Sequence, residues 1–135
     1  MNVWKIGSRW SETGTKDSSV LDIFDKHRIV FAGRKTDTIK SNVKIGDLIS
    51  ISDGLKIVRV GQVISLPKKI TEFKFFDKVD KKRFDYNDET VGFRVELFKL
   101  DESEIFKTSM GTFNKMNKRY DKIKDIYNEK LLTSS

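Results

Sequence analysis

The 135-residue sequence predicts an α+β fold: a small, twisted, partly closed β-barrel of five to six strands, flanked by two or more helices. Most of the chain consists of short runs in which apolar and polar residues alternate, as in half-buried strands. One helical pattern lies near the N-terminus and another closes the chain. The spacing is too short for repeated strand–helix–strand units, which argues against a parallel doubly wound sheet. With one proline and no internal repeat, we expect a single domain over residues 1–135.

The first elements follow from short apolar patterns. Residues 3–7 predict a strand. Ser19 and Asp22 match a capping box, with serine at the cap and an acidic residue three positions later, and apolar residues follow at helical spacing. We therefore expect a helix over 19–27, and then a buried strand over 29–32, "IVFA".

The segment "GDLISISDGLKIVRVGQVISL" predicts a hairpin. Ile49 and Ile51 alternate with serines, and the Asp-Gly pair at 53–54 is typical of a tight turn. The partner strand is expected to run to Leu66. Within it, Gly61 predicts either a bulge or a close backbone approach.

The second half of the chain contains one strong strand and one helix. Residues 68–90 predict a charged loop with a short strand in it, and "TVGFRVELFKL" predicts a strand with Val91, Phe93, Val95 and Leu97 on one face. A further short strand is expected within 104–110. Residues 113–131 predict an amphipathic helix with a basic outer surface; its apolar stripe consists of Met116, Tyr120, Ile123, Tyr127 and Leu131.

Composition excludes several kinds of chemistry. Without cysteine there is no disulfide framework and no thiol nucleophile, which fits a cytoplasmic protein. The lone histidine, His27, cannot supply the several ligands of a zinc site, and no phosphate-cradling glycine motif is present. Charges interrupt the N-terminus from Lys5 onward, and no run of about 18 apolar residues occurs. We therefore expect no cofactor, no metal, no membrane partner and no catalytic residue.

The charge favours an anionic partner. Lysine and arginine number 27 against 20 acidic residues, for a net charge of +7. Nucleic acid is the first candidate, and a soluble protein that is merely basic is the alternative. The interleaved basic and aromatic tract 67–84 and the C-terminal basic residues predict contacts to a phosphate backbone, or else a solvated surface. The candidates are Lys68, Lys69, Lys81, Lys82, Arg83, Lys115, Lys118, Arg119 and Lys122.

Both tryptophans lie near the N-terminus. In an extended strand, Trp4 and Trp10 would be roughly 20 Å apart. A bend at Gly7 would instead let the two rings form a flat slot suited to a stacked base; the alternative is that both are core residues. Asp47 and Asp53 are either turn formers or, at the rim of a strand pair, acceptors for the N–H groups of a base.

The segments "VWKIG", "IVFAG" and "VKIGDLISISDGLKIVRVGQVIS" resemble, in this order, the PUA-like superfamily, most nearly its EVE and YTH branches. The resemblance covers about residues 3–66, and 91–131 in outline. It implies a small barrel with a pocket in which aromatic side chains cage a modified base. Carried onto this sequence, the pocket residues are Trp4 and Trp10, with Ser8 and Arg9 beside them and Asp53 as a polar reader.

The leading hypothesis is a non-enzymatic module that binds DNA or RNA and reads a modified base. Two alternatives stay open. One is a protein-interaction or small-molecule-sensing module that works with other domains or subunits of a restriction or defence system. The other is a hydrolase of RNA or a nucleotide, as in the ASCH branch of the same superfamily.

Overall fold

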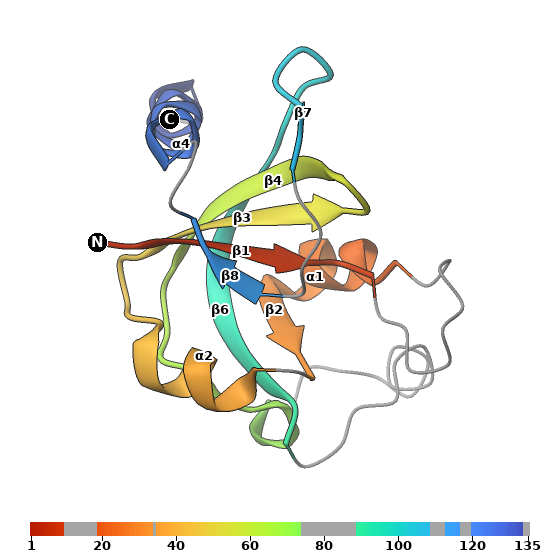
Figure 1. The fold of residues 1–135 in the computed structure, drawn as a ribbon, viewed down its shortest axis with the longest axis vertical. Coiled ribbons are helices and arrows are strands. Elements are labelled where there is room, and N and C mark those ends of the chain that lie inside the picture. Colours follow the sequence, from red (N-terminus) through yellow and green to blue (C-terminus); the bar gives the residue numbers. More distant parts are fainter. Residues whose placement is uncertain (10–18, 34, 74–88, 109–112, 117–119, 134–135) are drawn as a thin grey trace.

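The computed structural model describes residues 1–9, 19–33, 35–73, 89–108, 113–116 and 120–133 (Figure 1). In chain order the elements are β1 (Val3–Gly7), α1 (Leu21–His27), β2 (Ile29–Ala32), α2 (Thr36–Asn42), β3 (Leu48–Asp53), β4 (Lys56–Val63), β5 (Lys68–Lys69), the 3-10 helix η1 (Ile70–Glu72), β6 (Val91–Lys99), β7 (Phe106–Lys107), β8 (Phe113–Lys115) and α4 (Tyr120–Thr133).

The strands form one curled mixed sheet, and the predicted α+β half-barrel is confirmed. Six strands follow the order β2-β6-β4-β3-β1-β8, while β5 pairs with β6 and β7 with β4. The β1–β3 pair is parallel, and the other pairs are antiparallel. The outermost strands of this path, β2 and β8, do not pair with each other, and the Nζ of Lys35, which follows β2, donates to the Phe113 carbonyl of β8 at 3.0 Å.

Two apolar cores lie on the two faces of this sheet. The inner core contains Trp4 and Ile6 of β1, residues of α1, β2 and α2, and the four predicted inward residues of β6. The second core lies between the outer face and α4, and it includes Val3, Val60 and Ile123. Among the described residues, no helix is long and apolar enough to cross a bilayer.

The predicted hairpin is confirmed in β3 and β4. Gly54 adopts φ +65 in the two-residue turn, a conformation that glycine adopts without strain. The second strand ends at Val63 rather than Leu66, and Leu66 is exposed. Gly61 marks a close approach: a Cβ at this position would lie 2.3 Å from the Glu96 carbonyl oxygen of β6. The bulge lies instead at Val58, where the β3–β4 register shifts.

The helices differ from the sequence prediction at their boundaries. α1 begins at Leu21 with Val20 as its cap, so Ser19 is not the cap residue; its Oγ accepts a hydrogen bond from the Leu21 N–H at 3.3 Å. α2 was not predicted, because it buries only Ile39 and therefore shows no apolar stripe. The short strand expected within 68–90 is β5, and residues 74–88 lie outside the described part.

The start of the C-terminal helix was predicted wrongly. Residues 113–115 form β8 beside β1, because Phe113 packs into the inner core, and α4 starts at Tyr120. Residues 120–133 contain three lysines and three acidic residues, so their charges balance and α4 itself has no basic outer surface. The strand expected within 104–110 is β7, with two residues.

Candidate functional site

The chain turns back directly after β1. Ser8 is fully buried, and its N–H and Oγ donate to the Ser52 carbonyl at 2.8 and 2.9 Å. The next residue, Arg9, forms an isolated antiparallel bridge with Ser19, so the residue before the segment 10–18 and the residue after it lie side by side. Ser8 therefore anchors the end of β1 to β3, and its hydroxyl is not directed to solvent.

Arg9 and Asp53, two predicted site residues 44 positions apart, meet at this end of the sheet. Arg9 Nε donates to Asp53 Oδ1 at 3.0 Å, and the two side chains are 45% and 31% exposed. The guanidinium also lies over the turn, with Nε 3.6 Å from the position that a Cβ on Gly54 would take. Within the described residues, Asp53 Oδ2 accepts no hydrogen bond. The pair thus presents a carboxylate oxygen at the rim, where the N–H groups of a base could donate to it.

Trp4 is a core residue. Its ring is 4% exposed and stacks on Phe113, with centroids 5.1 Å apart and an interplanar angle of 16°. Its indole N–H donates to Asp47 Oδ2 at 2.9 Å. In this structure both the ring and the N–H are engaged inside the protein, which matches the core alternative for Trp4. Trp10 lies outside the described residues.

Asp47 acts as a structural acceptor rather than a reader. Its carboxylate also accepts the backbone N–H groups of Asn2 and Lys44, at 3.1 and 3.0 Å. It is 4% exposed and closes the turn that leads into β3, where Gly46 has φ +95. The turn-former interpretation of Asp47 therefore applies, whereas Asp53 has the geometry of a rim acceptor.

The basic residues that were predicted to contact the phosphate backbone of a nucleic acid are spread over the molecule. Lys68 and Lys69 pair with the start of β6, Lys115 is in β8 next to Trp4, and Lys122 lies over the Phe106 ring at 4.2 Å. All four are exposed, and none takes part in an ion pair within the described residues. The remaining candidates lie outside the described residues; they are Lys81, Lys82, Arg83, Lys118 and Arg119.

Lys5 is a feature that the sequence analysis missed. It lies between two inner-core residues of β1 and so points to the opposite face, where Ser50 and Asn114 are its partners in register. It is 3% exposed, and this burial lowers its pKa. The signal in the sequence is a lysine inside the apolar run "VWKIG". A buried amine with a lowered pKa is a candidate functional group.

No cluster in the described residues brings together three or more histidine, cysteine or acidic side chains that could hold a metal ion. His27 is the last residue of α1 and is half-buried.

No protein-family model matches the chain. No curated protein matches it in sequence. One solved structure with a similar fold is that of a hypothetical protein from Leishmania major. The match has 12% sequence identity and a TM-score of 0.56, and it covers 98% of this chain and 97% of the other. At this identity the similarity concerns the fold alone.

Proposed function

We propose that this protein binds nucleic acid and reads an unstacked base at the end of β1. The proposal depends mainly on four exposed lysines that form no ion pair within the described residues, Lys68, Lys69, Lys115 and Lys122. Lysines in this state on a chain of net charge +7 can release counterions from a phosphate backbone, which is the main source of affinity for nucleic acid.

Base reading is proposed for the rim formed by Arg9 and Asp53. The open Oδ2 of Asp53 is a strong acceptor for the N–H groups of a base, because a charged acceptor forms the stronger hydrogen bonds. Trp10 follows Arg9 directly in the sequence and supplies an aromatic ring for stacking. Trp4 has no part in this version of the pocket, since its ring is covered by the core. The resemblance to EVE and YTH modules points to a methylated or hydroxymethylated base as the ligand.

The test is fluorescence anisotropy with labelled single-stranded DNA and RNA oligonucleotides, each with and without one modified base. The wild-type protein should bind, with a salt dependence that steepens by about 0.7 per phosphate contact. Trp10→Ala should weaken binding by about ten-fold, the size of one lost stacking interaction. Asp53→Asn should reduce the preference between modified and unmodified oligonucleotides while the salt slope stays unchanged.

Absence of binding to every oligonucleotide at low salt would overturn the proposal. Equal affinity for all oligonucleotides, unchanged by Trp10→Ala, would remove base reading and leave only backbone binding. Breakdown of the oligonucleotide, lost in Lys5→Met, would instead support the hydrolase alternative, because a lysine of lowered pKa is suited to proton transfer.

A further inference from the structure

The described residues include two arginine–aspartate ion pairs, and the two pairs use their carboxylates differently. In the first, Arg59 of β4 donates from Nε and Nη2 to the two carboxylate oxygens of Asp25 in α1, at 3.1 and 2.9 Å. In the second, Arg9 donates to Asp53 from Nε, and only Oδ1 accepts. The two aspartate side chains are similarly exposed, 37% for Asp25 and 31% for Asp53. The pairs therefore differ in whether the arginine occupies both oxygens of the carboxylate.

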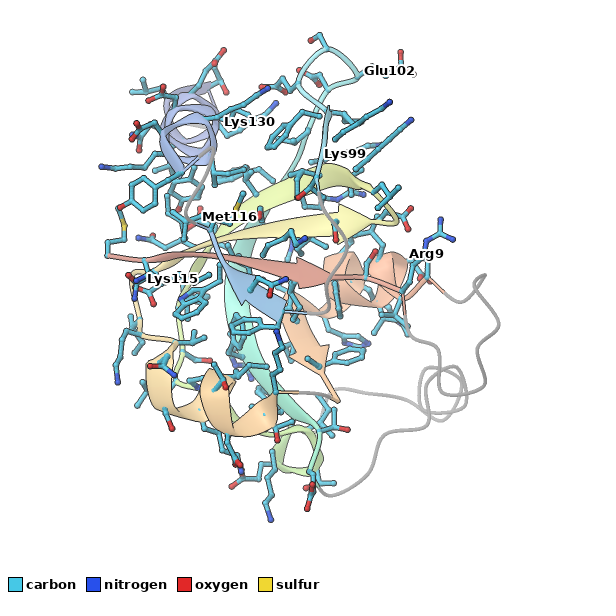
Figure 2. All side chains as sticks on the ribbon, viewed as in Figure 1. Arg9, Lys99, Glu102, Lys115, Met116 and Lys130 are labelled. Carbon is cyan, nitrogen blue, oxygen red and sulfur yellow. The ribbon has the colours of Figure 1, made fainter. Side chains whose placement is uncertain are left out.

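The Asp53 carboxylate keeps most of its capacity to accept hydrogen bonds. An ionised carboxylate has about four positions that accept a hydrogen bond, two on each oxygen. Within the described part of the chain, the Asp53 side chain uses one of them, for Arg9. Figure 2 shows Arg9 at the margin of the molecule, beyond the end of β1. The outer edge of the carboxylate, formed by Oδ2 and a lone pair of Oδ1, is therefore open to a ligand at this margin.

The surroundings of Asp53 suit a ligand that is flat and carries negative charge elsewhere. Gly54 follows Asp53 without a side chain, and the Arg9 guanidinium lies 3.6 Å from the position that a Cβ would take there. Lys56 is the cross-strand partner of Asp53; it is exposed and forms no ion pair within the described residues. The carboxylate thus has two cationic neighbours, Arg9 and Lys56, and the net positive charge of this group attracts an anionic strand.

The bases of a nucleic acid differ in what they present to a carboxylate. Guanine has two adjacent donors on its Watson–Crick edge, the ring N1–H and the N2 amino group. Adenine and cytosine have one amino group beside a ring nitrogen that accepts, and uracil and thymine have one N–H between two carbonyl oxygens. A carboxylate has no donor, so a base acceptor placed opposite one of its oxygens is repelled. Two parallel N–H donors match the two oxygens of a carboxylate, as the fork of an arginine does.

We propose that the Arg9–Asp53 rim is specific for guanine, whose N1–H and N2 amino group donate to the outer edge of the Asp53 carboxylate. This inference rests on the proposed function and adds to it the identity of the base. Arg9 is a positioning residue, because its Nε–H holds the carboxylate through Oδ1. A modification on the opposite side of the guanine ring leaves both donors in place, so specificity for guanine is compatible with the reading of a modified base.

The test uses single-stranded oligothymidylates that carry one central guanine, hypoxanthine, adenine or cytosine. Hypoxanthine keeps the N1–H of guanine and lacks the N2 amino group, so it removes only one of the two hydrogen bonds. In fluorescence anisotropy the wild-type protein should bind the guanine strand about ten-fold more tightly than the hypoxanthine strand, the usual effect of one hydrogen bond to a charged group. The adenine and cytosine strands should bind more weakly than the hypoxanthine strand, because each places an acceptor against Asp53.

Two variants locate the preference in the structure. Asp53→Asn should bring the affinities for the guanine and hypoxanthine strands to within about two-fold, because an amide side chain accepts through one oxygen only. Asp25→Asn is the matched control, since it makes the same substitution in an arginine–aspartate pair of similar exposure whose two oxygens are both occupied. The control should keep the wild-type preference for guanine. Circular dichroism of both variants verifies that each is folded.

The outcomes separate this inference from the proposed function. If the wild-type protein binds single strands but does not distinguish guanine from hypoxanthine, the inference is wrong and the proposed function stands. The inference is also wrong if the preference survives in Asp53→Asn, or if folded Asp25→Asn loses it to the same extent. If the wild-type protein binds no oligonucleotide, both the inference and the proposed function are wrong.

Discussion

Asp47 immediately precedes β3 and Asp53 ends it, and substitution by alanine should affect the stability of the fold very differently at the two positions. Asp47 accepts three N–H groups, from Asn2, Trp4 and Lys44, and is 4% exposed. Within the described part of the chain the Asp53 side chain accepts one N–H group, from Arg9, in a partly exposed pair. We therefore expect Asp47→Ala to destabilise the fold and Asp53→Ala to leave it nearly unchanged.

The magnitudes follow from these contacts. The Trp4 N–H, left without an acceptor in the interior, should cost about 2 kcal/mol, and the part-buried N–H groups of Asn2 and Lys44 about 1 kcal/mol each, so Asp47→Ala should lower the free energy of unfolding by roughly 4 kcal/mol. For 135 residues this corresponds to a fall of roughly 14 °C in melting temperature, given the usual unfolding entropy per residue. Loss of the Arg9–Asp53 pair should cost less than about 1 kcal/mol, because solvent screens exposed ion pairs.

Thermal unfolding followed by circular dichroism, with urea titration as a second measure, tests this difference. Oligonucleotide binding is measured on the same samples: Asp53→Ala should reduce discrimination between modified and unmodified bases at unchanged stability. Similar melting temperatures for the two variants would refute the assignment of Asp47 as the structural acceptor of Trp4. So would a greater loss of stability in Asp53→Ala.

Two further stability predictions concern the sheet and the C-terminal helix. Gly61→Ala should lower the free energy of unfolding by about 3 kcal/mol, because its Cβ would lie 2.3 Å from the Glu96 carbonyl oxygen. Gly92→Ala, whose Cβ would have its nearest contact at 3.0 Å, should lower it by less. Equal losses for the two variants in urea unfolding would contradict this prediction. The side-chain hydrogen bond from Lys130 and the hydrogen bond from the Asp101 N–H lower the pKa of Glu104 in the folded protein. The contribution of Glu104 to the stability of the fold is therefore complete above its unfolded pKa, near about 4.3, and is lost as the pH falls through the folded pKa. Glu104→Gln should therefore lower the melting temperature by about 3 °C at neutral pH. The difference should shrink as the pH falls below the unfolded value, and a difference that stays the same in acid would show that the side chain acts by packing.

The sequence determined those elements whose pattern is local. The alternation in β6 predicted that strand and its two faces correctly, and the Asp-Gly pair at 53–54 predicted the β3–β4 hairpin, because each depends on a few neighbouring residues. The faces of β4 were predicted wrongly, because the bulge at Val58 interrupts the alternation and Ile64 and Leu66 are exposed. Gly61 indicated a close backbone approach or a bulge, and the tertiary structure supplied the approaching strand, β6, which is distant in the sequence. The helical spacing after Tyr120 was read correctly, but it was extended too far back, since Phe113 fits a helical stripe as well as it fits a core strand.

Only the tertiary structure decided the surroundings of the site residues. Trp4 is enclosed because Phe113 and Asp47, 109 and 43 positions away, contact it, and no spacing in the sequence encodes such pairings. Arg9 and Asp53 became neighbours through the parallel β1–β3 pair. Register between distant strands depends on the packing of the whole sheet, and a single bulge at Val58 sets which side chains share a face.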